Sequence, residues 1–263
     1  MPTNNTANIK QWLEKSEVDY ITQFVKAWIP FNAWYRREYD TLEKERDILN
    51  EVKTDGNKIR SRFMAKLEGN DPDSQEIRNH IAALHRRLSA DPLEDSKQRR
   101  ISFEKVFIGR NPQNFAQNKI GQWFYRVERV TASQNVVSTI TSTRGRVQTT
   151  ITQTTGWNIE EFELHPDYVS LSAHDKAILR QSYEASNPVS FASLLSATPP
   201  PDALVMDSYH FVKDKPAIFA GLIEILYSMR NMLFHGELVP DPQTNRTYEP
   251  AYHLLRHLIA TIV

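Results

Sequence analysis

The sequence of 263 residues lacks cysteine, lacks a net charge and lacks a long apolar run. Without cysteine the chain can hold no disulfide, no thiolate zinc site and no cysteine nucleophile. Basic and acidic residues number 32 each, so the protein as a whole has no long-range attraction for polyanions. The longest apolar run, residues 217–227, carries Glu224 and is far shorter than the about 20 residues of a membrane span. The first residues form no basic-then-apolar leader, and we expect a cytoplasmic protein.

Most of the chain is patterned as helix. Residues 16–52 place Phe24, Trp28 and Phe31 at helical spacing, and Pro30 is expected to kink this helix or divide it in two. Ser16 and Asp19 are candidate caps at its start. Further helical patterns cover residues 57–92, 170–185, 188–196 and most of the last third. A turn segment at 237–250 makes the last two helices antiparallel neighbours.

The middle of the chain has a different composition. Residues 121–156 are rich in Val, Ile and Thr and alternate in polarity, with Arg144-Gly145 as a turn between two runs. This segment is too rich in Thr and Arg to suggest a second core. The sequence therefore predicts a mainly α bundle, a single domain over residues 1–263, with a β-hairpin or ribbon inserted at about 121–156.

Positive charge gathers around this ribbon. Residues 97–150 hold ten basic side chains against two acidic ones, in a chain of no net charge. Arg126, Arg129, Arg144 and Arg146 lie on the ribbon itself, where Trp123, Phe124 and Tyr125 supply aromatic rings. Such a surface can hold a phosphate backbone and stack a base, which makes the four arginines candidate RNA contacts. The alternative is an edge hairpin whose charges prevent aggregation.

A candidate site lies in residues 227–243, "YSMRNMLFHGELVPDPQ". Arg230 and Asn231 stand in an apolar helix, and His235 follows just before Gly236, the residue type expected after a helix end. Arg230 and His235 are five positions apart, or about 140° around a helix, so they converge only if the helix ends at the histidine.

These three residue types can do phosphodiester chemistry. Arginine binds phosphate through a planar cationic fork, and histidine exchanges protons near neutral pH. With an amide beside them they could activate a ribose 2′-hydroxyl without a metal. The alternative is a buried trio whose members satisfy one another. Arg78, Asn79 and His85 form a similar string inside a polar helix, where we expect solvated surface.

The string "RNMLFHG" resembles the Arg-polar-spacer-His motif of the HEPN superfamily. A second string near the other end of the chain, "WIPFNAWY" (residues 28–35), is similar to the Trp-x-x-Phe-Asn-Ala-x-Tyr pattern of many bacterial members. The resemblance covers residues 16–40 and 203–263 and leaves the ribbon out. Two positions depart from the family. Pro30 replaces a commoner alanine, and Glu237 stands where a nucleotidyltransferase-regulated branch carries a tyrosine that is modified.

The resemblance implies an HEPN-like helical bundle that dimerises and cleaves RNA without a metal or another cofactor. In this role Arg230 would hold the phosphate, His235 would act as acid or base, and Asn231 would orient them. Many members are toxins or anti-phage defence effectors, and some have an antitoxin or a defence-system partner protein. Other members are inactive modules that bind RNA, nucleotide or a partner protein, and this alternative stays open.

Four further polar residues have structural interpretations. Asn32 lies among aromatic residues and is expected to bond another helix, with Arg230 or His235 as possible partners. Glu224 is expected to pair with an arginine. His253 and His257 are four residues apart, a spacing that can hold a metal. No third ligand is evident in the sequence, which favours a structural pair.

Overall fold

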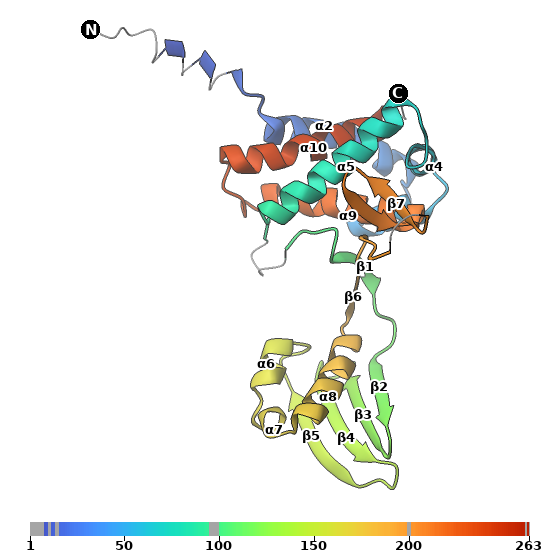
Figure 1. The fold of residues 1–263 in the computed structure, drawn as a ribbon, viewed down its shortest axis with the longest axis vertical. Helices are drawn as coiled ribbons and strands as arrows, with labels where there is room; N and C mark the ends of the chain where they lie inside the picture. The colour runs from blue at the N-terminus through green and yellow to red at the C-terminus, as the bar shows by residue number, and fades with distance from the viewer. Residues whose placement is uncertain are drawn as a thin grey trace, which may run out of the picture. The chain divides into compact units, whose positions relative to one another are not determined.

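The computed structural model describes residues 8–9, 12–13, 16–94, 100–198, 201–260 and 262. They form two compact units, one of residues 1–106 with 192–263 and one of residues 107–191 (Figure 1). The second unit extends well beyond the ribbon expected at 121–156. The fold contains 51% helix and 19% strand, so the prediction of a mainly α fold is wrong and the class is mixed α/β.

The first unit is built mostly from helices. Its chain order is α2 (Tyr20–Glu38), α3 (Glu45–Thr54), α4 (Lys58–Lys66), α5 (Pro72–Ala90), the hairpin β7 (Ala203–Met206) and β8 (Tyr209–Val212), α9 (Lys215–Phe234) and α10 (Pro242–Ile259). Helix α10 packs along α2 and against α5, while α3 and α4 pack on α9. The first helix and the two last helices therefore share one hydrophobic core.

Helix α2 begins with a predicted cap and is not divided at Pro30. Asp19 caps it by accepting a hydrogen bond from the Thr22 backbone N–H. The helix continues past Pro30, so the proline does not divide it. The helical segment expected over 16–52 is divided instead between Glu38, where α2 ends, and Glu45, where α3 begins. Pro30 lies on the exposed side of the helix, where water can satisfy the carbonyl that loses its helical donor.

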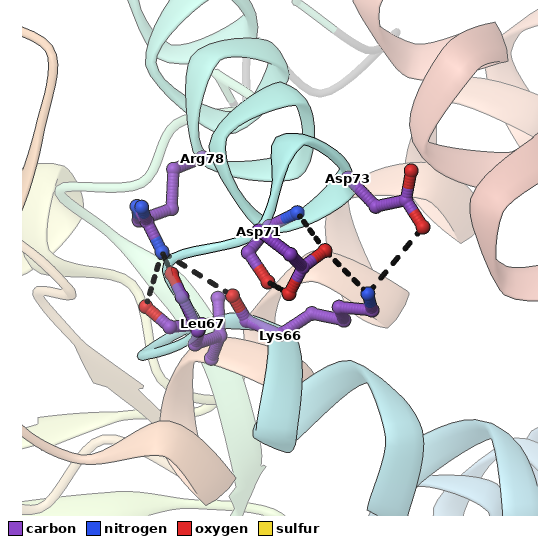
Figure 2. Close-up of polar contacts among 7 residues, drawn as sticks. Lys66, Leu67, Asp71, Asp73 and Arg78 are labelled. Carbon is purple, nitrogen blue, oxygen red and sulfur yellow. Dashed lines mark hydrogen bonds and ion pairs between the residues drawn. The ribbon is translucent and has the colours of Figure 1, made fainter.

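The turn between α4 and α5 explains the second Arg-Asn string. Asp71 caps α5 through the Ser74 N–H, and its carboxylate also accepts from Lys66 (Figure 2). Arg78 donates to three backbone carbonyls at the end of α4, those of Lys66, Leu67 and Gly69. His85 is buried with its ring edge-on to Tyr209, at 4.5 Å between centroids. The expectation of solvated surface is therefore wrong for His85, which is buried, and for Arg78, which is half-buried, whereas Asn79 is exposed as expected.

The second unit is a four-stranded antiparallel sheet with helices on one face. Its strands follow one another in space in the order β2 (Phe115–Ile120), β3 (Trp123–Arg129), β4 (Val136–Ser142) and β5 (Val147–Gln153). Helix α8 (Ala173–Ala185) packs on β2, β3 and β4, after the short helices α6 (Ile159–Leu164) and α7 (Pro166–Val169). The strands β1 (Val106–Arg110) and β6 (Val189–Ala192) pair with each other in a sheet of their own.

This unit has its own hydrophobic core, contrary to expectation. One face of the sheet buries Tyr125, Val127, Ile140 and Ile151 against the helices. The open face carries the threonines and charges that dominated the composition, because successive side chains of a strand point to opposite faces. The turn at Arg144-Gly145 forms as predicted, with Gly145 at a φ of 82°.

Helix α9 is the one helix of the described residues that is long and apolar enough to cross a membrane. It is mostly buried, with 56% of its most apolar 18-residue window inside the protein. Its buried side chains, from Ile218 to Met232, belong to the core of the first unit. Burial on this scale is what the central helix of a folded domain shows.

Candidate functional site

The candidate site lies at the carboxyl end of α9, which closes with a glycine cap. His235 is the C-cap residue and still has right-handed helical backbone angles. Gly236 follows with a φ of 67°, a conformation that glycine adopts without strain. The Glu237 N–H then bonds the Met232 carbonyl and the Gly236 N–H bonds the Leu233 carbonyl. These two bonds satisfy carbonyls that the helix end would leave unpaired. The helix stop predicted at His235-Gly236 is confirmed.

Arg230 is held in place one turn before this end. Its Nη1 donates to Oδ1 of Asn231 at 2.9 Å and lies 3.4 Å from Oε2 of Glu45 on α3. The Phe234 ring lies under the guanidinium, with 4.5 Å from the ring centroid to the Arg230 Cζ. The Arg230 side chain is 20% exposed, and its Nε is buried with no hydrogen-bond acceptor among the described residues. The guanidinium is thus oriented but still holds an unused donor.

Glu45 connects the two sequence motifs. Its Oε1 accepts a hydrogen bond of 2.5 Å from the hydroxyl of Tyr35, which is fully buried on α2. Burial, then the hydrogen bond to Glu45, raises the pKa of Tyr35 far above its ordinary value, so Tyr35 is a fixed donor. Tyr35 ends the aromatic string of the first helix, and Arg230 begins the motif of α9. The sequence does not indicate a role for Glu45, because nothing distinguishes it from the other charged residues of "TLEKERD".

His235 stands apart from Arg230. Its side chain is exposed and forms no hydrogen bond, ion pair or ring contact with any residue that the structure describes. The structure brings Arg230 and Asn231 together but does not bring His235 to them within one chain. The imidazole is therefore available to solvent, to a ligand or to a second copy of the chain.

Asn32 and Glu224 have partners other than Arg230. Oδ1 of Asn32 accepts from Nε of Arg36, one turn along the same helix, so the expected bond to another helix is wrong. Glu224 is 4% exposed and accepts from Arg46 at 2.7 and 2.8 Å and from Lys53 at 2.5 Å. The expected arginine partner of Glu224 is confirmed. Glu224 therefore joins α9 to α3 in the first unit, whereas Asn32 bonds only within its own helix.

The four candidate RNA-binding arginines fall into two pairs. Arg126 donates to Glu128 at 2.9 and 3.2 Å and covers the Phe115 ring. Arg129 donates to the carbonyls of Asn111 and Gln113. Both arginines are occupied by protein partners.

Arg144 and Arg146 form the other pair. They flank Gly145 in the exposed turn between β4 and β5 and have no side-chain partner among the described residues. Lys119 lies on the open face of the sheet over the Phe124 ring, at 5.5 Å from its centroid. Lys97 and Arg99 of the basic segment lie outside the described residues.

Comparison of the chain with protein-family models, curated proteins and solved structures finds no match.

Proposed function

We propose that this protein is a metal-independent endoribonuclease of HEPN type, with its active site composed from two copies of the chain. The observation that supports this proposal best is the arrangement at the end of α9. Arg230 is oriented by Glu45 and Asn231, while the His235 side chain is exposed at the helix end and has no partner among the described residues. A phosphate-binding cation and an available proton-exchanging group are thus presented on one helix.

A second copy supplies what one chain lacks. Cleavage of an RNA phosphodiester needs one group that takes a proton and another that gives one. In a two-fold dimer, His235 of one copy takes the proton of the 2′-hydroxyl, and the 2′-oxygen attacks the adjacent phosphorus. The bond from phosphorus to the 5′-oxygen breaks, and the second copy's His235 protonates that oxygen. The products are a 2′,3′-cyclic phosphate and a 5′-hydroxyl, and the two copies of Arg230 stabilise the charge on the phosphoryl oxygens.

The turn between β4 and β5 fits a role in RNA binding. The side chains of Arg144 and Arg146 have no protein partner among the described residues, so they are free to neutralise phosphates. Arg126 and Arg129 already donate to protein oxygens and contribute less. The setting that we propose is a cytoplasmic toxin or anti-phage effector, held inactive by an antitoxin or another defence-system partner.

A non-catalytic module that binds RNA, nucleotide or a partner protein is the second candidate. It is favoured by one observation, which is that the charge of Arg230 is already partly neutralised by Glu45 at 3.4 Å. A phosphate must compete with this carboxylate for the guanidinium. In a binding module the same ion pair would simply be part of the fold.

Cleavage of mixed RNA by the purified chain in EDTA separates the two candidates. We expect cleavage by the wild type, and a loss of about 10²- to 10⁴-fold in His235→Ala. His174→Ala is the matched control, because His174 is an exposed helical histidine outside the motif and should leave the rate unchanged. Circular dichroism checks that each protein is folded in EDTA. Equal cleavage by His235→Ala, or none by the folded wild type, overturns the nuclease proposal.

A further inference from the structure

A cluster of imidazoles and one carboxylate lies between α5 and α10, outside the candidate site. Helix α5 contributes Glu76 and His80, and α10 contributes His253 and His257. Each pair is four residues apart, so its members lie on one face of their helix. The two helices pack on each other, which brings together two faces that are far apart in the sequence.

Three of these side chains converge on one point. Nε2 of His80 and Nε2 of His257 lie 3.4 and 3.7 Å from the same oxygen, Oε1 of Glu76. The potential ligand atoms of the three residues all lie within 4.8 Å of one another. No other side chain shares this oxygen among the described residues.

The distances suit a shared ion better than direct hydrogen bonds. Ordinary N–H···O bonds measure about 2.7–3.2 Å, and both contacts to Glu76 are longer. Zinc binds imidazole nitrogen and carboxylate oxygen at about 2.0–2.2 Å, so two ligand atoms of a zinc tetrahedron are separated by about 3.4 Å. The two measured separations are close to this edge length. A cation placed between the three groups would draw together ligand atoms that already lie within 4.8 Å of one another.

We propose that Glu76, His80 and His257 form a binding site for a divalent transition-metal ion, with Zn²⁺ as the ion that its ligands suit best. Two imidazoles and a carboxylate are the ligand set of many three-residue zinc sites, whereas Mg²⁺ and Ca²⁺ prefer oxygen ligands only. The side chains of His80 and His257 are 21% and 23% exposed, and that of Glu76 is 54% exposed. The ion would thus be reached from solvent and keep a fourth position for water.

The surroundings of His80 hold its imidazole in one orientation. The His253 ring stacks on that of His80, with centroids 4.6 Å apart and planes within 6° of parallel. In this stacked position His253 orients His80 and is not itself a ligand. It is a positioning residue.

This site is independent of the proposed nuclease activity. A metal held there joins α5 to α10 and stabilises the packing of the first unit, because metal binding to the folded state adds to its stability. Neither Arg230 nor His235 contributes a ligand. The proposal of a metal site and the proposal of metal-independent cleavage can therefore be tested separately.

Calorimetric titration of the full chain with zinc chloride, after removal of metal by chelator and dialysis, tests the proposal. We expect one Zn²⁺ per chain, a melting temperature that rises with zinc, and no binding of Mg²⁺. Zinc affinity should fall by more than about 100-fold in His80→Ala and His257→Ala, beyond the loss seen when only an outer-shell partner is removed. Glu76→Gln should also weaken binding. Glu76 is largely exposed, so this variant remains informative if a histidine variant fails to fold.

Two matched variants sharpen the result. His174→Ala removes an exposed histidine elsewhere and should leave zinc affinity unchanged. His253→Phe keeps a ring against His80 and should retain most of the affinity, whereas His253→Ala should lose about 10- to 100-fold. The proposal is overturned if the wild type binds no zinc, or if Glu76→Gln and a folded His80→Ala bind it as tightly as the wild type does. Loss of binding in His253→Phe would overturn the three-ligand assignment.

Discussion

Tyr35 and Arg230 bind opposite oxygens of one carboxylate, that of Glu45. The Tyr35 hydroxyl donates to Oε1 at 2.5 Å, and Nη1 of Arg230 lies 3.4 Å from Oε2. The carboxylate thereby fixes the guanidinium against helices α2 and α3. Under the proposed function, this orientation would lower the entropy that Arg230 loses on binding an anion.

Tyr35→Phe should destabilise the first unit without removing a large part of its core. The variant leaves one oxygen of the half-buried Glu45 without its donor, and a hydrogen bond to a charged group contributes about 1.5–3 kcal/mol. Urea unfolding should show a decrease of this size in the free energy of unfolding. Tyr252→Phe is the control, since the Tyr252 hydroxyl makes no hydrogen bond with any described residue. Equal stability of the Tyr35→Phe variant and the wild type would contradict a structural role for this contact.

Glu224→Gln should be more damaging than the simultaneous replacement of Glu224 and Lys53. Both side chains are buried, and breaking a buried pair by removing one charge costs about 3–5 kcal/mol. The double variant Lys53→Met with Glu224→Leu leaves no lysine charge in the core and should recover much of that loss. Urea unfolding of the three proteins measures both effects. A double variant less stable than Glu224→Gln would show that the ion pair stabilises the fold by more than the desolvation of its two charges destabilises it.

The second unit should lose stability at high pH. Burial, then the hydrogen bond to Asp175, raises the pKa of Tyr125 to about 12. A phenol whose pKa is raised by folding stabilises the protein fully below its unfolded pKa of about 10, and this contribution is lost as the pH rises through 12. Thermal unfolding between pH 9 and pH 12, followed by tyrosinate absorbance, measures the effect. This range begins about one unit below the unfolded pKa and ends at the folded pKa of Tyr125. Tyr125→Phe should show a smaller decline, and an equal decline in both proteins would contradict this assignment.

Local chemistry explains which features were predictable from the sequence. The cap at Asp19, the helix stop at Gly236 and the turn at Gly145 depend on a few adjacent residues, and each forms as expected. The strands β6, β7 and β8 lie in segments whose sequence pattern does not predict a strand. Each is only four residues long, and apolar runs of that length fit either structure.

Long-range pairing explains what the sequence could not show. The prediction of a mainly α fold is wrong mainly because residues 107–191 form a second core, in which helices α6 to α8 cover one face of the sheet. Glu45 and Glu76 acquire their roles only when helices distant in sequence meet them. The carboxylate and the imidazole that lie near His257, those of Glu76 and His80, are on α5 and far from it in the sequence.

Cleavage should depend on the concentration of the chain if the site is composite. Two copies of His235 provide one base and one acid, so a monomer lacks one of the two. We expect light scattering to show a dimer, and the rate per chain to fall on dilution as the dimer dissociates. RNA binding, measured separately, need not fall in parallel. A chain that is monomeric at micromolar concentration and still cleaves RNA at full rate would exclude the composite site.

Replacing Arg144 and Arg146 together should weaken RNA binding and leave the chemical step unchanged. These two side chains are exposed in the β4–β5 turn, and neither transfers a proton in the proposed mechanism. The double alanine variant should raise the RNA concentration for half-maximal rate and keep the saturated rate. Each lost phosphate contact should reduce the slope of log affinity against log salt by about 0.7 on a single strand.

Arg126→Ala is the matched comparison for this variant. Its guanidinium already bonds Glu128 and covers Phe115, so its loss should change the salt slope by less than half of the change in the double variant. Filter binding over a range of salt concentrations measures all three slopes. The contrary result is a double variant with a normal slope and a lost dimer. The turn would then be an oligomerisation element, since exposed β edges readily pair with one another.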